Sequence, residues 1–375
     1  MNSAFKAKTY DAIVVGGGAA GVGVAIALKD AGIENFLVLE RYQIGSSFDS
    51  WPAETRLITP SFPSNSVGML DLNSIAIGVS PAFSMKVEHP TGKEYAAHLR
   101  GVAAFFHLPI RENTHVIRIN KIGDDFVIDT PDETLRAKHL VWAAGEFQFP
   151  QLGGFTGSEL CRHTATIASY EQLEGDNFLI IGGCESGVDA AYYLSTRGKR
   201  SRLFDRGAPW DTESSEPSGA LSTYSHERMR EDCFQQFVEL MPDSAIESVD
   251  QIDGEYQVTT DDGRWFRSEA APILAGGFQV GHKLVDDMFE KREDGYALLN
   301  EHDESTLTPS LFLSGPAVRH DGHIFCFIYK YRQRFAVVAK AIATSLEMPA
   351  EYLEQYRKWG MYLDDLSCCG QECVC

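Results

Sequence analysis

The chain has 375 residues, of which 33 are Lys or Arg and 53 are Asp or Glu, giving a formal net charge of −20 at pH 7. This acidic balance disfavours binding to nucleic acid or to anionic membranes. Hydrophobic residues make up 44% and charged residues 23% of the chain, a composition typical of a globular enzyme large enough for two domains. No apolar run reaches the roughly 18 residues of a membrane helix, and no signal-peptide pattern is present, so we expect a cytoplasmic protein.

A glycine-rich turn follows the first apolar run of the chain. Residues 12–15 (Ala-Ile-Val-Val) predict a strand, residues 16–21 read Gly-Gly-Gly-Ala-Ala-Gly, and residues 22–29 predict a helix. Gly16 permits a tight turn, Gly18 lets the backbone approach a pyrophosphate, and Gly21 allows close packing of the helix on the strand. The free N–H groups at the start of such a helix bind phosphate. The pattern therefore predicts a dinucleotide-binding turn.

An acidic residue stands at the expected distance from this turn. The next apolar run, 36–39, ends on Glu40, where a carboxylate accepts hydrogen bonds from a ribose. A glycine triplet alone is weak evidence, but the triplet with its strand, its helix and this acid is a strong signal for a nucleotide site.

The same arrangement recurs later in the chain. Residues 178–181 predict a strand, residues 182–187 read Gly-Gly-Cys-Glu-Ser-Gly, residues 188–194 predict a helix, and the strand 202–204 ends on Asp205. Two such sites suggest two nucleotides that meet face to face, one donating hydride to the other. Cys184 stands where the second glycine belongs, and its Cβ keeps the backbone further from a pyrophosphate. A second domain of the same fold without a nucleotide is the open alternative.

The two turns together resemble those of the flavoproteins with two dinucleotide-binding domains. This superfamily includes pyridine nucleotide-disulfide oxidoreductases of the thioredoxin reductase kind, bacillithiol-disulfide-reductase-like proteins and flavin monooxygenases. Three further segments are similar to the family: 140–145 (Leu-Val-Trp-Ala-Ala-Gly), 273–278 (Ile-Leu-Ala-Gly-Gly-Phe) and 311–315 (Leu-Phe-Leu-Ser-Gly). The resemblance implies an α/β fold with two Rossmann-like domains. An FAD-binding domain (1–150 and 275–349) would enclose an NAD(P)H-binding domain (151–274), and a C-terminal helix with a cysteine-rich tail (350–375) would follow.

The resemblance also implies the cofactors and their contacts. FAD would occupy the first site and NADH or NADPH the second, with hydride passing from nicotinamide C4 to flavin N5. We expect FAD to contact Gly16, Gly18, Ala20, Gly21, Glu40, Arg41, Phe48, Trp51, Val116, Ala144, Gly145 and Gly315. We expect NAD(P)H to contact Gly182, Glu185, Ser186, Gly187 and Asp205.

Two of these expectations have open alternatives, and one expected contact has no candidate residue. Phe48 and Trp51 suit a flat conjugated ring, but ordinary core packing explains them equally well. Asp205 favours NADH because a carboxylate binds a 2′-hydroxyl better than a 2′-phosphate, whereas the nearby arginines 200, 202 and 206 argue for NADPH. In the family an aspartate after the last flavin-domain strand holds the ribityl chain. Here that position is Pro316, which has neither a carboxylate nor an N–H, so the ribityl contact is unexplained.

Residues 328–345 predict a helix, and the resemblance implies that its positive N-terminus faces the flavin. Cys326 lies just before it and is a candidate redox thiol with a lowered pKa; a buried, inert cysteine is the alternative.

The polar stretch 211–222 predicts a loop, either a lid or a solvated connection. Residues 114–117 and 125–128 predict strands.

The C-terminal tail contains four of the eight cysteines within its last eight residues. It resembles in kind the thiol arm of mercuric reductase and the redox tails of large thioredoxin reductases. Thiols in the cytoplasm are normally reduced, so the cluster is more consistent with redox chemistry or metal binding than with a structural framework. A disulfide between the adjacent Cys368 and Cys369 would be strained and easily reduced. Four thiolates also suit a soft metal ion such as Zn(II), Cu(I) or Hg(II).

The motifs that mark two particular activities of the family are incomplete in this chain. No Cys-x-x-Cys occurs in either nucleotide domain, and Cys161 occupies the histidine position of the flavin-monooxygenase motif that begins at Phe155. We expect an FAD-dependent NAD(P)H oxidoreductase that reduces a small-molecule or protein disulfide or a thiol-bound acceptor. Its catalytic candidates are Cys368, Cys369 and Cys326, with no dedicated metal site and a homodimer as an open expectation. A monooxygenase or oxidase using O2, and a non-catalytic flavin protein with a metal-holding tail, are the alternatives.

Overall fold

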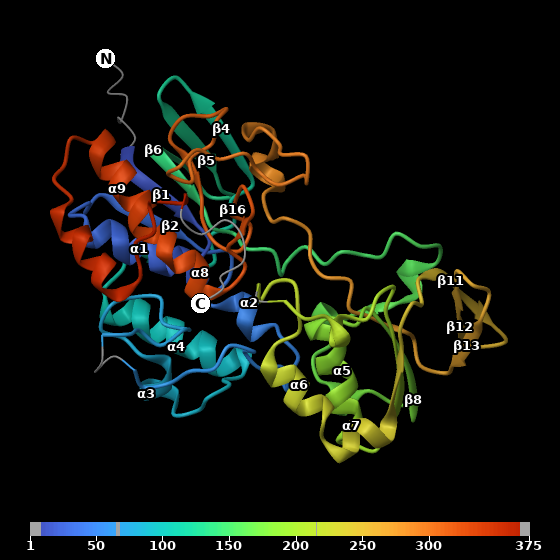
Figure 1. The fold of residues 1–375 in the computed structure, drawn as a ribbon. Helices are drawn as coiled ribbons and strands as arrows, with labels where there is room; N and C mark the ends of the chain where they lie inside the picture. The colour runs from blue at the N-terminus through green and yellow to red at the C-terminus, as the bar shows by residue number, and fades with distance from the viewer. Residues whose placement is uncertain (1–8, 65–67, 215, 368–375) are drawn as a thin grey trace.

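The computed structural model describes residues 9–64, 68–214 and 216–367 (Figure 1). Its first sheet has seven strands in the order β3-β2-β1-β6-β5-β4, with β15 also paired to β6. The parallel strands are β1 (Thr9–Val15), β2 (Phe36–Leu39), β3 (Ile110–Arg111), β6 (Thr134–Trp142) and β15 (Leu311–Leu313); β4 (Arg118–Ile122) and β5 (Asp125–Asp129) are antiparallel. β2 is buried throughout, as expected for a strand of a sheet covered on both faces.

Two helices far apart in the sequence pack together on this sheet. α1 (Ala19–Asp30) follows the first glycine turn, and α9 (Phe335–Ser345) lies against it (Figure 1). A Cβ at Gly23 would overlap the ring of Phe335, so only glycine allows this close approach. α4 (Gly92–Phe105) begins with a capping box formed by Thr91 and Glu94. The final strand and helices thus complete a domain whose first strands come from the start of the chain.

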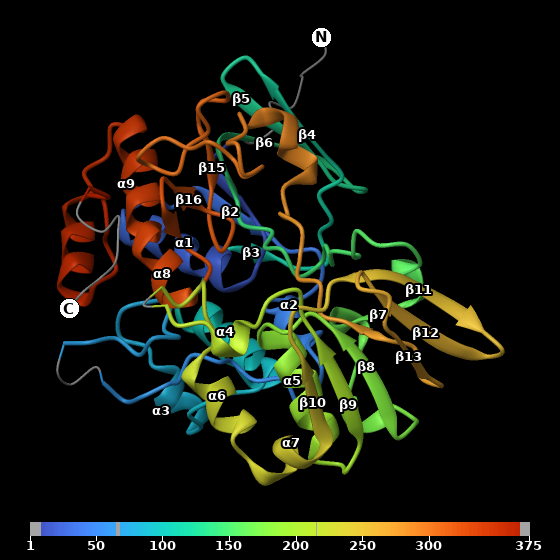
Figure 2. The same ribbon diagram turned by 45° about the vertical axis from the view of Figure 1, so that its right-hand side comes forward.

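A second sheet forms from the middle of the chain. Its five parallel strands lie in the order β10-β9-β8-β14-β7. These are β7 (Arg162–His163), β8 (Asn177–Ile181), β9 (Arg200–Phe204), β10 (Val238–Met241) and β14 (Ile273–Leu274), with helices α5 (Glu185–Ser195), α6 (Thr223–Met229) and α7 (Asp232–Phe237). An antiparallel sheet of β11 (Ile246–Ile252), β12 (Glu255–Thr260) and β13 (Trp265–Ser268) lies beside it (Figure 2).

Short elements complete the described chain. They are α2 (Ser46–Asp49), α3 (Pro81–Met85), α8 (Ile328–Tyr331), the hairpin β16 (Arg319–His320) and β17 (His323–Ile324), and the 3₁₀ turns η2 (Ser158–Leu160), η3 (Thr164–Thr166), η4 (Tyr170–Gln172), η5 (Pro209–Asp211), η6 (Lys283–Met288), η7 (Arg332–Arg334) and η8 (Glu351–Trp359).

Two connections join the sheets, one in each direction. They run side by side, because Gln151 N–H donates to Gly277 O (3.0 Å) and Gln279 N–H donates to Phe149 O (2.8 Å). In Figure 2 both pass between the two sheets near α2. The α/β fold with two Rossmann-like sheets is therefore as predicted, while the exact domain limits at 150, 274 and 349 stay predictions.

Two local predictions are wrong. Residues 114–117 form no strand, since Thr114 N–H donates to Glu40 O outside any ladder and β4 begins only at Arg118. The helix predicted over 328–345 is interrupted: α8 ends at Tyr331, and η7 precedes α9. The interruption coincides with two buried arginines, because Arg332 donates to Asp71 O and Ser74 O, and Arg334 donates to the Asp303 carboxylate.

Candidate functional site

A cavity of about 940 Å³ lies where the two sheets meet. Its wall begins at the first glycine turn, passes the ends of β1, β2 and β6, and reaches the N-terminus of α5. The carboxyl ends of parallel strands beside a glycine-rich turn are the usual place for a nucleotide in this type of sheet. The size suits a drug-sized or cofactor-sized ligand.

The first glycine turn has the geometry that its sequence predicts. Gly16 adopts a φ of 113°, and a Cβ there would overlap the carbonyl oxygen of Ala143. A Cβ at Gly21 would overlap the carbonyl oxygen of Gly16. Gly18 differs from both, because a Cβ there would meet no protein atom within 4 Å. Gly18 therefore faces open space at the start of α1, which is what a phosphate cradle requires.

Glu40 organises this turn. Its carboxylate accepts hydrogen bonds from Gly17 N–H (2.6 Å), Tyr42 N–H (2.9 Å) and Ser46 Oγ–H (3.1 Å). A carboxylate offers about four acceptor positions, so a place remains for a ribose hydroxyl. The sequence predicts the ribose contact but not the bonds to the turn.

The second turn repeats this backbone arrangement. Gly182 has a φ of 103°, and a Cβ there would lie 2.5 Å from Ala275 O. Asp205 accepts hydrogen bonds from Gly183 N–H (2.7 Å) and Gly207 N–H (2.8 Å), as Glu40 does in the first turn. Cys184 is exposed at the start of α5.

The cavity wall contains many of the predicted cofactor contacts and leaves out others. Residues in the wall are Gly16, Gly18, Ala20, Glu40, Arg41, Phe48, Trp51, Val116, Ala144, Gly145, Glu185, Ser186 and Cys326. Residues outside it are Gly21, Gly182, Gly187, Asp205 and Gly315. Gly21 and Gly315 act in packing: a Cβ at Gly315 would lie 3.1 Å from the Cβ of Ala20. The contacts to cofactor themselves stay predictions.

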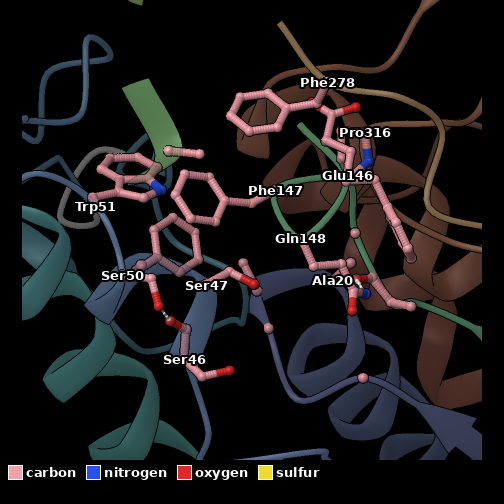
Figure 3. A pocket seen from close by; sticks show the side chains of 18 of the residues that line it. Ala20, Ser46, Ser47, Ser50, Trp51, Glu146, Phe147, Gln148, Phe278 and Pro316 are labelled. Atoms are coloured by element: carbon pink, nitrogen blue, oxygen red, sulfur yellow. Dashed lines mark hydrogen bonds between the residues drawn. The ribbon is translucent and has the colours of Figure 1, made fainter. Parts of the chain in front are cut away.

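Aromatic side chains gather at one end of the cavity. Phe48 and Trp51 have ring centroids 5.1 Å apart, and Phe147 and Phe278 have centroids 5.2 Å apart. Figure 3 shows Trp51, Phe147 and Phe278 directed toward the same space. Phe48 also packs edge-on against the buried Tyr95, so it belongs to the core and to the cavity wall at once.

Cys326 lies in the cavity wall, but the prediction that its thiol has a lowered pKa is wrong. Burial raises the pKa of its thiol, whereas proximity to a helix N-terminus was expected to lower it. α8 has only four residues, too few for a strong helix dipole. The Cys326 Sγ lies 2.9 Å from Ser218 Oγ. Its catalytic role stays a prediction, and Cys368 and Cys369 lie outside the described residues.

The polar loop that contains Ser218 is docked on the first domain. Glu216 forms an ion pair with Lys330 of α8, and Lys330 also donates to Ser218 Oγ (3.1 Å). At the end of this loop Glu185 accepts hydrogen bonds from Ser222 N–H and from Ser225 Oγ–H (2.6 Å). The loop therefore bridges α5 and α8 and contacts two residues of the cavity wall, Glu185 and Cys326.

One buried ion pair of the site has no counterpart among the predicted residues. Asp189 lines the cavity and accepts hydrogen bonds from Arg228 (2.6 Å) and from Thr55 Oγ–H (2.6 Å). Burial raises the pKa of Asp189, and the adjacent Arg228 guanidinium opposes that rise. Thr55 belongs to the segment after α2, so this contact ties the first domain to α5. Asp189 follows Glu185 by four residues on one helix face, a signal that was available in the sequence.

Two searches of the described residues give negative results. No group of three or more His, Cys, Asp or Glu side chains in residues 9–64, 68–214 and 216–367 is placed to hold a metal ion. In the same residues, no helix has the length and apolar character needed to span a membrane.

Comparison with known proteins establishes the family. Residues 13–315 match the pyridine nucleotide-disulphide oxidoreductase family, which is most of the chain. The chain belongs to this family. Membership of an oxidoreductase family agrees with the family resemblance of the two glycine turns.

Individual relatives are more distant. The chain is 30% identical over 191 residues to the uncharacterized oxidoreductase CzcO of Bacillus velezensis, covering 50% of this chain and 52% of that protein. The matched region spans about half the length of such curated relatives.

Solved structures share the fold over a longer range. The bacillithiol disulfide reductase Bdr (YpdA) of Staphylococcus aureus superposes with a TM-score of 0.75 at 18% identity, covering 90% of this chain and 99% of that one. A flavin-containing monooxygenase from Stenotrophomonas maltophilia gives a TM-score of 0.69 at 16% identity, covering 90% and 99%. These likenesses concern the fold alone.

Proposed function

We propose that this chain is an FAD-dependent NAD(P)H oxidoreductase that reduces a disulfide or a thiol-bound acceptor. The observation that carries the proposal is one cavity that extends from the first glycine turn to the N-terminus of α5 in the second domain. Such a cavity allows a flavin and a nicotinamide to meet. The residues fit FAD, because Gly18 borders open space and aromatic rings border the far end.

Each part of the wall has a role in this proposal. Gly18 and the start of α1 would bind the pyrophosphate of FAD, and Glu40 would bind its ribose. Phe48 and Trp51 would pack against the flavin ring and limit water. The start of α5, at Glu185 and Ser186, would bind the phosphates of NAD(P)H. When both cofactors are bound, the chemistry they supply is transfer of hydride from nicotinamide to flavin and onward delivery of the electrons.

The electron acceptor is the second part of the proposal. The fold likeness to a bacillithiol disulfide reductase and the four tail cysteines support a disulfide or a thiol-bound acceptor. One observation favours the alternative of O2: the Cys326 thiol in the wall has a raised pKa and is therefore a poor nucleophile. An acceptor that takes electrons directly from the flavin would need no such thiol. A metal-holding tail on a non-catalytic flavin protein is the third candidate.

Anaerobic reduction of the purified yellow protein tests these candidates in one experiment. NADH or NADPH should bleach the flavin, and a disulfide acceptor should restore its colour. Consumption of O2 in a fixed ratio to a hydroxylated product would instead support the monooxygenase. Metal binding without any bleaching would support the third candidate. Sedimentation analysis of the same sample tests the expected homodimer.

A further inference from the structure

Glu146 is unlike the other acidic residues of the cavity. Four acidic side chains line the wall: Glu40, Glu146, Glu185 and Asp189. Three of them accept two or more hydrogen bonds from protein donors. Within the described residues the Glu146 carboxylate forms no hydrogen bond or ion pair, although burial raises its pKa. A half-buried carboxylate without donors is unfavourable unless a ligand supplies them.

The cation that acts on Glu146 has other partners. The charge of Arg319 lowers the pKa of Glu146, but within the described residues the two side chains form no ion pair. Its guanidinium, however, donates to Pro316 O and to Val318 O (2.8 Å) and lies 4.3 Å from the ring centroid of Tyr296. Arg319 therefore holds the Pro316 turn, and the Glu146 side chain, which lines the cavity, has no protein donor among the described residues.

The position of Glu146 along the cavity indicates which part of a ligand it meets. Figure 3 draws Glu146 beside Pro316, with Phe278 on one side and Gln148 and Ala20 on the other. Gly315, which precedes Pro316, packs against Ala20, where an added Cβ would lie 3.1 Å from the Ala20 Cβ. Ala20 belongs to the turn that would bind the pyrophosphate, and the aromatic end would hold the ring. Between the pyrophosphate and the ring, FAD carries only its ribityl chain, whose hydroxyl groups are hydrogen-bond donors. Glu146 is an acceptor-only group when ionised.

We propose that Glu146 binds the ribityl hydroxyl groups of FAD, in place of the carboxylate that Pro316 cannot supply. This inference rests on the proposed binding of FAD in the first site. Glu146 reaches this place from the connection after β6, and Pro316 follows β15, the parallel strand paired with β6. Glu146 is thus a cofactor-binding residue that the sequence pattern does not identify.

The test measures FAD affinity of the full-length apoprotein by quenching of FAD fluorescence. Wild type is compared with Glu146→Ala, Glu146→Gln and the matched control Glu159→Ala, which changes an exposed glutamate outside the cavity. A hydrogen bond to a charged group predicts that Glu146→Ala weakens FAD binding about 10-fold to 100-fold. Glu146→Gln should weaken it less, because the amide oxygen still accepts. Glu159→Ala should bind like wild type.

A flavin analogue makes the test independent of folding. Wild type should bind FAD about tenfold or more tightly than an FAD analogue lacking a ribityl hydroxyl, whereas Glu146→Ala should bind the two alike. Equal affinity of wild type for both, or the same discrimination in Glu146→Ala, overturns the inference. If the discrimination holds but NAD(P)H does not reduce the bound flavin, this inference stands and the proposed activity fails. If wild type binds no FAD, both fail.

Discussion

The two glycine turns share a backbone and differ in what surrounds them. In both, the first glycine has a φ above 100° and presses against a neighbouring alanine residue, and an acid at the end of the next strand accepts a bond from the following N–H. The first turn opens on the cavity at Gly18. In the second, the residue that corresponds to Gly18 is Cys184, which is exposed and does not line the cavity. The preceding Gly183 lies against Trp210, 2.5 Å from an added Cβ, and Glu185 is bonded to α6.

This difference shows that turn geometry and ligand access have separate causes. The backbone of each turn follows from glycines and one acid that are close in sequence. The access of a ligand to each turn depends on side chains from later segments of the chain, such as Trp210 and Ser225. We therefore expect substitutions of the turn glycines to act alike in the two domains, and substitutions at the third position to act differently.

The largest effect should come from the last glycine of each turn. A side chain at Gly21 or Gly187 would overlap the carbonyl oxygen of the first glycine. Gly21→Val and Gly187→Val should each destabilise the protein by about 3 kcal/mol or more, measured as the free energy of unfolding in urea. Comparable stability to wild type in either variant would show that the two turns are not equivalent.

Gly18→Val should separate folding from cofactor binding. No protein atom lies within 4 Å of the added Cβ, so the apoprotein should remain folded by circular dichroism. The branched side chain would occupy the position expected for the pyrophosphate, so flavin should be lost on purification, measured as the ratio of absorbance at flavin and protein wavelengths. A fully loaded yellow variant would contradict the assignment of FAD to the first turn.

Deletion of residues 368–375 should show that both turns work without the tail. Flavin reduction by NAD(P)H should keep its rate, because both turns and the cavity lie elsewhere in the chain. Transfer to a disulfide or thiol-bound metal acceptor should fall to background, measured as steady-state turnover with that acceptor. Full turnover of the truncated protein would exclude a relay through Cys368 and Cys369.

Coenzyme choice tests the acid of the second turn. Asp205 favours a 2′-hydroxyl, and Arg202 is paired with Glu239 (2.6 Å), which leaves fewer cations for a 2′-phosphate. We expect NADH to reduce the flavin about tenfold faster than NADPH at equal subsaturating concentration, an effect of about 1.4 kcal/mol. Stopped-flow absorbance measures both rates, and a faster reaction with NADPH would reverse the assignment.

The smallest effect should come from Cys184→Gly. Removing the Cβ would let the second turn approach a pyrophosphate as the first does. The Kd for NADH should fall a few-fold, with Cys184→Ser as the control that keeps the Cβ and binds like wild type. Weaker binding by the glycine variant would show that the exposed thiol contributes to the site.

The sequence by itself determined the fold class, the two glycine turns and the strands that flank those turns. Apolar runs such as Phe36–Leu39 are buried because they are continuous, and turn glycines are recognisable because few residues adopt their backbone angles. Such properties depend on neighbours within a few residues, so a local pattern predicts them. The same reasoning fails at residues 114–117, where a strand was predicted but Thr114 N–H donates to Glu40 O instead of joining a ladder.

Only the tertiary structure decided which side chains share the cavity. Glu146, Asp189 and the Cys326–Ser218 pair depend on segments more than a hundred residues apart coming together. The pKa of Cys326 is likewise set by burial among those segments rather than by its place before a helix. Sequence patterns record the periodicity of one element, whereas burial, hydrogen-bond partners and cavity walls arise from the packing of several. For that reason the turns were predictable and their surroundings were not.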